Sequence, residues 1–170
     1  MFRQVAILGT GLMGGSLAAA LRARLPGVRL VGFGRDPDIS RAMELGLFDV
    51  RADLVADALA GADLVVLAAP ISVNCALVPE VATLLPPDAV LTDLSSVKGP
   101  VVTAWRRTIA AMSDGAVGQA TPGPGDFVPC HPIAGSDRGG PDAADLDLFV
   151  SREVVLSPLP GNRPDSVERL

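Results

Sequence analysis

A glycine-rich turn near the start of the chain constrains its fold more than any other feature. The stretch Gly9-Thr10-Gly11-Leu12-Met13-Gly14 follows the apolar run 5–8 and opens a helical pattern over 12–24. Glycines at this spacing permit a tight strand-to-helix turn, a close approach of backbone to a pyrophosphate, and close packing of helix on strand. The free N–H groups at the start of such a helix bind phosphate oxygens. The turn therefore predicts a dinucleotide-binding unit.

Strand and helix patterns alternate along the rest of the chain. Further strands are predicted at 29–33, 63–69, 89–91, 127–130 and 153–156, and further helices at 37–45, 52–60, 71–85, 100–112, 143–149 and from about 165 onward. The segment 113–126 holds four glycines and two prolines and predicts a mobile loop. Such alternation predicts an α/β fold of the Rossmann type, a doubly wound parallel sheet covered by helices on both faces.

Composition bounds the class of protein. With 170 residues, 49% of them hydrophobic, the chain can form one sizeable core, and a single domain is the default. Its net charge of -5 and the lack of a basic run exclude an extended nucleic-acid-binding face. No stretch reaches the roughly 18 unbroken apolar residues of a membrane span, so we expect a cytoplasmic protein. Cys75 and Cys130 lack metal-like spacing, so we expect reduced thiols and no metal site.

The end of the second predicted strand discriminates between the two nicotinamide dinucleotides. A carboxylate there bonds the ribose 2′-hydroxyl of NAD, whereas an arginine accommodates the 2′-phosphate of NADP. Here Gly34 occupies that position, Arg35 follows it, and Asp36 is the competing candidate for the ribose contact. We expect NADP to be favoured over NAD, the alternative being that Arg35 is only a solvated loop charge.

Ligands of open parallel sheets bind at the carboxyl ends of the strands, so the residues that follow each strand are candidates for function. The segment 68–71 ends the fourth strand with small residues and a proline. Ala69 and Pro70 would let a nicotinamide ring lie close to the backbone. A simple strand end explains the same residues equally well.

Two further segments at this edge of the sheet carry polar side chains. The segment 92–98 contains hydroxyls, a carboxylate and the only lysine, Lys98. The sequence leaves the roles of Lys98 and Cys130 open. Ser95 is expected to cap the next helix rather than to act in catalysis. The segment 131–137 begins with His131, the only histidine. A lone histidine is usually a packing residue, but a neutral imidazole suits proton transfer from an alcohol that loses hydride.

The segments 9–14, 92–98 and 131–137 together resemble the prephenate and arogenate dehydrogenase family. The family pattern includes His-Pro-(Ile/Met)-Ala-Gly-(Thr/Ser) and Asp-x-Gly-Ser-Val-Lys, and the resemblance runs from residue 5 to about 158. It implies an NAD(P)-dependent oxidative decarboxylation of prephenate or arogenate in tyrosine biosynthesis, in which hydride leaves the carbon that bears the hydroxyl and CO2 leaves from the opposite ring carbon. Aromatisation drives such a reaction.

The resemblance also implies roles for individual residues. His131 would hydrogen-bond the ring hydroxyl of the substrate, and Ser96 would orient His131 and the cofactor side of the site. Both would line the substrate pocket with Ser136 and Asp137. The residues expected to bind the cofactor are Gly9, Thr10, Gly11, Leu12, Met13, Gly14, Gly34, Arg35, Asp36, Ala69 and Pro70. The chain departs from the family pattern at two positions, because Ser95 replaces a glycine and Asp137 stands where a longer glutamate is common.

The resemblance implies two domains in full-length relatives, which are homodimeric through a helical second domain that also supplies a substrate-binding arginine. We expect residues 1–160 to form the dinucleotide-binding domain, and 161–170 to begin the connection to a second domain that this chain lacks. The chain alone is then expected to be monomeric and to bind cofactor with little dehydrogenase activity. Two other readings stay open: an NADP oxidoreductase of the β-hydroxyacid or imine reductase type, and a regulatory module that binds NADP without turnover.

Overall fold

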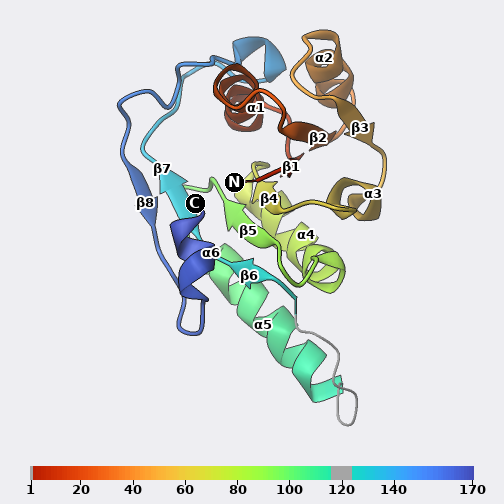
Figure 1. Cartoon of the computed structure of the whole chain (residues 1–170), viewed down its shortest axis with the longest axis vertical. Coiled ribbons are helices and arrows are strands. Elements are labelled where there is room, and N and C mark those ends of the chain that lie inside the picture. Colours follow the sequence, from red (N-terminus) through yellow and green to blue (C-terminus); the bar gives the residue numbers. More distant parts are fainter. Residues whose placement is uncertain (1, 116–123) are drawn as a thin grey trace.

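The computed structural model describes residues 2–115 and 124–170 (Figure 1). Its elements are β1 (Gln4–Leu8), α1 (Leu12–Arg24), β2 (Arg29–Phe33), α2 (Asp38–Glu44), β3 (Val50–Ala52), α3 (Val55–Leu59), β4 (Leu64–Leu67), α4 (Ile71–Leu84), β5 (Val90–Asp93), α5 (Gly99–Gly115), β6 (Asp126–Phe127), β7 (Cys130–Pro132), the 3-10 helix η1 (Pro141–Ala143), β8 (Val154–Leu156) and α6 (Pro164–Glu168). No described helix has the length and apolar character that a membrane crossing needs.

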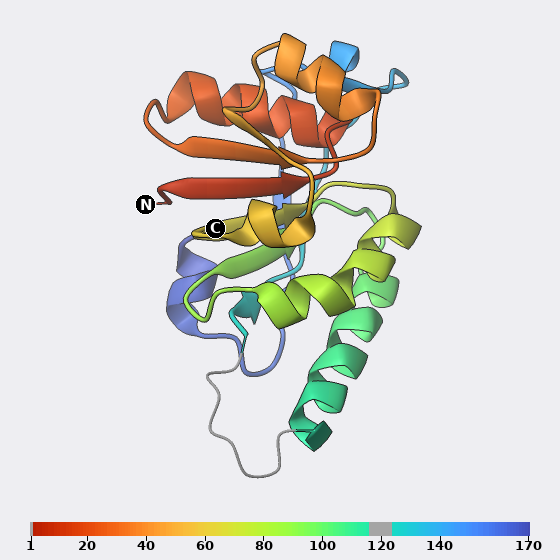
Figure 2. The ribbon, with the colours of Figure 1, turned by 90° about the vertical axis from the view of Figure 1, so that its right-hand side faces the viewer.

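Six strands form one parallel sheet in the order β3-β2-β1-β4-β5-β6. Their order can be followed in Figure 1, and Figure 2 shows β1 and β2 running in the same direction, so that their carboxyl ends lie at the same edge. Residue Val5 of β1 pairs with Leu30 of β2 on one side and with Leu64 of β4 on the other. The chain reverses its direction of winding between β1 and β4, which is where open α/β sheets bind their ligands. The predicted doubly wound parallel fold is confirmed.

Both faces of the sheet are buried, because successive strand residues point to opposite sides. On one face, Leu8 belongs to a core cluster with Val78 of α4 and Trp105 of α5, to which α3 also contributes. On the other face, Ile7 belongs to a cluster with Ala18 of α1, to which α2 and α6 contribute. The continuous apolar runs in the sequence therefore correspond to strands covered on both sides.

The predicted helix over 52–60 is wrong at its beginning, where the short strand β3 forms instead. Val50 of β3 pairs with Val31 of β2, Arg51 is exposed and Ala52 is buried. This alternation is that of an edge strand, and pairing with β2 outweighs the helix preference of the alanine. The helix itself, α3, is shorter than predicted.

The predicted single strand over 127–130 is two strands. The N–H of Val128 still donates to the carbonyl of Leu91 (2.9 Å), which continues the pairing of β6 with β5. Pro129 has no N–H to donate, so the ladder stops there. From Cys130 the chain turns away and forms β7, which pairs antiparallel with β8 in a separate two-stranded sheet.

The predicted helix over 143–149 is also wrong. The residues form the 3-10 turn η1 followed by further turns. Besides turn bonds within the segment, its polar groups bind α1: the N–H of Asp145, for example, donates to the hydroxyl of Ser16 (3.0 Å). These tertiary contacts replace the bonds that a helix would have made.

Two predictions concern residues at the ends of described elements. The first residues of the segment 113–126, predicted as a mobile loop, belong to α5, and 116–123 lie outside the described residues. Helix α6 packs against the sheet, with an ion pair of 3.0 Å between Arg163 Nε and Asp126 Oδ2 and with Val167 against the cluster that contains Ile7. The domain boundary at residue 160 stays a prediction.

Candidate functional site

The glycine-rich turn has the geometry that a pyrophosphate needs. Gly9 has a φ of 111°, and a Cβ there would lie 2.3 Å from the backbone nitrogen of Ala69. A Cβ on Gly14 would lie 1.9 Å from the carbonyl oxygen of Gly9, so α1 packs directly on the turn. A Cβ on Gly11 would meet no atom within 4 Å, and no side chain caps the helix there. The start of α1 thus leaves open space in front of free N–H groups.

A cavity of about 290 Å³ lies beside this turn, at the carboxyl ends of β1, β2 and β4. Its walls include the apolar side chains of Phe33, Val73 and Leu77, which suit the flat faces of a purine. Five residues predicted to bind cofactor line it as well: Gly9, Thr10, Gly34, Arg35 and Ala69. The structure thus brings together residues from three separate loops at one cavity beside the phosphate turn.

Position 34 has no room for an acidic side chain. A Cβ on Gly34 would lie 2.8 Å from the hydroxyl oxygen of Thr10, a side chain that is itself buried. A carboxylate at this position, as an NAD-type site requires, would have to displace Thr10. The glycine is therefore a packing requirement of the phosphate turn.

Asp36 and Arg35 differ in what already binds them. The carboxylate of Asp36 accepts two hydrogen bonds from Arg51 (3.0 and 2.9 Å) and one from the hydroxyl of Ser40. These bonds, those of Arg51 first, hold the pKa of Asp36 below its ordinary value. Arg35 is exposed, and its guanidinium makes no hydrogen bond or ion pair with any described residue. Of the two, Arg35 is the one left for a ligand, although Asp38 also lines the cavity.

Sequence reasoning missed Arg51, because the residues just before the predicted helix over 52–60 were assigned to no element. Placed on β3, it reaches across to Asp36 and also binds Asp53 (2.9 Å). A short alternating segment next to the second strand was the available signal.

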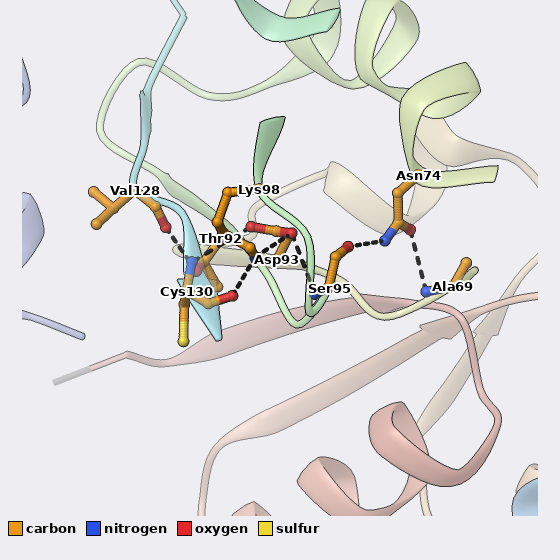
Figure 3. Close-up of polar contacts among 8 residues, drawn as sticks. All are labelled: Ala69, Asn74, Thr92, Asp93, Ser95, Lys98, Val128 and Cys130. Atoms are coloured by element: carbon orange, nitrogen blue, oxygen red, sulfur yellow. Dashed lines mark hydrogen bonds and ion pairs between the residues drawn. The ribbon is translucent and has the colours of Figure 1, made fainter. Parts of the chain in front are cut away.

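A buried polar network holds the ends of β4, β5 and β7 together (Figure 3). At its centre is Asp93, the last residue of β5, whose side chain is fully buried. Its Oδ2 accepts from Lys98 Nζ (2.6 Å) and from the N–H of Ser95 (3.2 Å), while Oδ1 accepts from the N–H of Cys130 (3.4 Å). Lys98 Nζ also donates to the carbonyl of Cys130. The role that the sequence left open for Lys98 is thus to pair a buried carboxylate and hold β7.

A second branch of the network runs from Asn74, a fully buried residue of α4 that sequence reasoning missed. Its Oδ1 accepts from the N–H of Ala69 (3.2 Å), and its Nδ2 donates to the hydroxyl of Ser95 (3.1 Å). The prediction that Ser95 caps the next helix is wrong, because α5 begins only at Gly99. An asparagine within an otherwise apolar helix was the signal for this branch.

The network anchors the residue that precedes each of the two predicted catalytic side chains. His131 follows Cys130, lies half-buried in β7 and pairs with Val155 of β8. Ser96 follows Ser95 and is exposed. Within the described part of the chain, no hydrogen bond joins Ser96 to His131. Their assigned roles stay predictions.

Ser136 and Asp137 lie on the exposed loop after β7. The hydroxyl of Ser136 donates to Asp137 (3.2 Å) and accepts from the N–H of Arg138 (3.2 Å). Ser136 and Arg138 line a second cavity of about 380 Å³ together with Leu12, the first residue of α1. The loop that carries the predicted substrate residues therefore borders the start of the helix that follows the phosphate turn.

The thiol of Cys130 should resist alkylation while the protein is folded. Burial raises its pKa to about 11, although the nearby Lys98 acts in the opposite direction. Because only the thiolate reacts, we expect iodoacetamide at about pH 8 to leave Cys130 unmodified. Mass spectrometry of the Cys75→Ala variant checks this, since Cys130 is then the only thiol: no adduct should form before urea is added and one should form after. An adduct on the folded variant would contradict the burial of this side chain.

Comparison with known proteins agrees with this arrangement. The family model described as "Prephenate dehydrogenase, nucleotide-binding domain" matches residues 17–170. The cyclohexadienyl dehydrogenase of Zymomonas mobilis is 33% identical over 159 residues, which cover 93% of this chain and 50% of that protein. The prephenate dehydrogenase of Lactococcus lactis is 31% identical over 156 residues, covering 91% and 41%. The chain thus spans about half the length of these relatives or less.

Solved structures give the same answer. Arogenate dehydrogenase from Synechocystis has a TM-score of 0.81 at 28% identity, covering 98% of this chain and 54% of that one. Prephenate dehydrogenase from Aquifex aeolicus, in complex with hydroxyphenyl propionate and NAD+, also has a TM-score of 0.81 at 28% identity, with 99% and 55% covered. An imine reductase from Pseudomonas, at 16% identity and a TM-score of 0.64, shares the fold alone. The predicted resemblance is confirmed, and the chain belongs to the prephenate dehydrogenase family, corresponding to its nucleotide-binding domain.

Proposed function

We propose that this chain binds NADP and supplies the cofactor site and the proton-accepting histidine of a dehydrogenase that acts on prephenate or arogenate. The observation that carries the proposal is the network around Asp93. It fixes the strand of His131 to the end of β5, at the edge of the sheet where the glycine-rich turn opens. The Aquifex relative, solved with hydroxyphenyl propionate and NAD+, supports a site of this kind.

The residues of the chain divide the work of binding. Gly11 and the N–H groups at the start of α1 receive the pyrophosphate, and the cavity between Phe33 and Leu77 receives the adenosine. Ala69 and Pro70 leave space for the ring at the other end of the cofactor. When bound, the nicotinamide accepts the hydride that the substrate loses.

For this reaction the protein has chiefly to align the donor carbon with the nicotinamide and to accept and return one proton. His131, as a neutral imidazole, accepts the proton of the ring hydroxyl as the C–H bond at the same carbon breaks and the hydroxyl becomes a carbonyl. The bond between the opposite ring carbon and the carboxylate breaks and CO2 leaves. Its electron pair completes the aromatic ring and returns the carbonyl oxygen to a hydroxyl, which takes back the proton held by His131. Ser96 orients His131, and Ser136 and Asp137 line the substrate pocket in this proposal.

Turnover with each candidate substrate tests the function. Purified protein is incubated with NADP and with prephenate, arogenate or a β-hydroxyacid, and formation of reduced cofactor is followed by absorbance. Turnover of either cyclohexadiene supports the proposal, whereas turnover of only the β-hydroxyacid would favour the other oxidoreductase class. Cofactor binding without any reduction, even when the remaining half of a relative is supplied, would indicate a regulatory module.

The choice of NADP over NAD rests on Arg35. We expect the unmutated chain to bind NADP more tightly, and Arg35→Ala to remove about 1.5–3 kcal/mol of that preference, the usual value of a charge-assisted hydrogen bond. Isothermal titration with both cofactors measures it, and added salt should narrow the gap as well. Arg107→Ala, which removes an exposed arginine on α5, is the matched control and should leave both affinities unchanged. Equal affinity of the unmutated chain for the two cofactors would contradict the assignment.

A further inference from the structure

The hydroxyl of Ser95 has its hydrogen-bonding direction fixed by its neighbours. The backbone N–H of Ala69 can only donate, so the atom of Asn74 that faces it must be the amide oxygen. The amide nitrogen of Asn74 therefore faces Ser95, and Ser95 Oγ must accept from it. The proton of the Ser95 hydroxyl is then free, and no described residue accepts it. A half-buried donor without a protein acceptor thus stands at the carboxyl end of β5 (Figure 3).

The position of this donor relative to the phosphate turn indicates which part of a ligand it meets. Ala69, which Asn74 holds, lies against Gly9, because a Cβ on that glycine would be 2.3 Å from the Ala69 nitrogen. The cavity proposed for the adenosine extends from the loop after β2 to Ala69 at the end of β4 and to α4. A dinucleotide that crosses the switch point between β1 and β4 then carries its nicotinamide beyond Ala69, toward the end of β5. The one polar substituent of the nicotinamide ring is its carboxamide.

Resting on the proposed function, we infer that Ser95 binds the carboxamide oxygen of the nicotinamide, with Asn74 as the residue that orients it. A neutral hydrogen bond of this kind changes affinity by a modest factor. The inference applies to this chain in particular, since the family pattern has a glycine at this position and no hydroxyl.

Three ligands separate this contact from a general support of the site: NADP, its thionicotinamide analogue, whose sulfur is a poor acceptor, and 2′-phospho-ADP-ribose, which lacks the nicotinamide. We expect Ser95→Ala to weaken NADP binding by about 2- to 10-fold, and to leave 2′-phospho-ADP-ribose unchanged. The unmutated chain should prefer NADP over the thio analogue, and this preference should disappear in Ser95→Ala. Ser95→Thr keeps the hydroxyl and should retain the preference for NADP over the thio analogue.

Ser113→Ala, on the exposed surface of α5, is the matched control and should affect none of the three ligands. Equal weakening of NADP and 2′-phospho-ADP-ribose by Ser95→Ala would overturn the inference, because Ser95 would then support the whole site. Unchanged affinity for every ligand would also overturn it. A failure of the unmutated chain to bind any of them would instead reject the proposed function.

Discussion

Replacement of His131 by alanine is expected to lower the turnover number by about 10²–10⁴-fold, the range for loss of one general acid–base group. The imidazole is the group proposed to take the proton of the ring hydroxyl, and no other histidine is present in the chain to replace it. The cofactor contacts lie on other loops, so affinity for NADP should change little. The turnover number is obtained from steady-state rates with prephenate and arogenate, measured on a form of the protein that is catalytically active. Affinity for NADP is obtained by titration.

The control for this variant must distinguish the loss of a proton acceptor from a disturbance of β7, the strand that carries His131. Val155→Ala alters the residue paired with His131 in β8 and removes no proton acceptor. If disturbance of the β7–β8 ladder caused the loss, both variants would be impaired alike. Near-normal turnover by His131→Ala would mean that the histidine is a packing residue.

Replacement of Lys98 by methionine is expected to lower the free energy of unfolding by about 3–5 kcal/mol, the cost of leaving a buried charge without its partner. Asp93 is fully buried, and Lys98 is the cation that faces it at 2.6 Å. Two backbone N–H groups remain on the carboxylate, but they carry no net charge to balance it. Urea unfolding followed by circular dichroism measures the loss. Because domains of this size are stable by only about 5–15 kcal/mol, the effect should be large.

Two further variants make the result interpretable. Arg24→Ala breaks the exposed pair with Asp147 (2.7 Å) and should cost no more than about 1 kcal/mol. Adding Asp93→Asn to Lys98→Met removes the unbalanced charge and should recover part of the loss. A cost for Lys98→Met as small as that for Arg24→Ala would show that the pair does not hold the ends of β5 and β7 together.

Much of the fold could be predicted because its signals are local. A strand buried on both faces appears as a continuous apolar run, as in 64–67, and the glycines of the phosphate turn occupy positions that steric contact dictates. The failures arose where a distant partner decided the local structure. Residue 52, predicted to begin a helix, ends the strand β3 because β2 offers an edge for pairing, and 143–149 makes bonds with α1 where a helix was predicted.

The sequence predicted that several candidate residues lie close together, but it did not predict the hydrogen bonds among the loops that carry them. Residues after each strand were selected because carboxyl ends meet at one edge, and Thr10, Arg35 and Ala69 do line one cavity. Asn74 was missed because its partners are contributed by other loops, and no spacing along the chain connects them. Asp36 seemed available in the sequence, but Arg51, fifteen positions away along the chain, already binds it.

The connection between β7 and β8 contacts elements that lie far away along the chain. It closes contacts between very distant points of the chain, including 129 residues between Ser16 and Asp145 and 123 between Arg24 and Asp147. Closing such long loops costs conformational entropy before any contact repays it, so segments of this kind order only after local and sequential elements have formed. We therefore expect this connection, which leads on from the strand of His131, to become ordered only after α1, with which it makes these contacts. In the proposed function, the cofactor surface at the start of α1 would then form before the segment that follows the proton-accepting histidine is fixed.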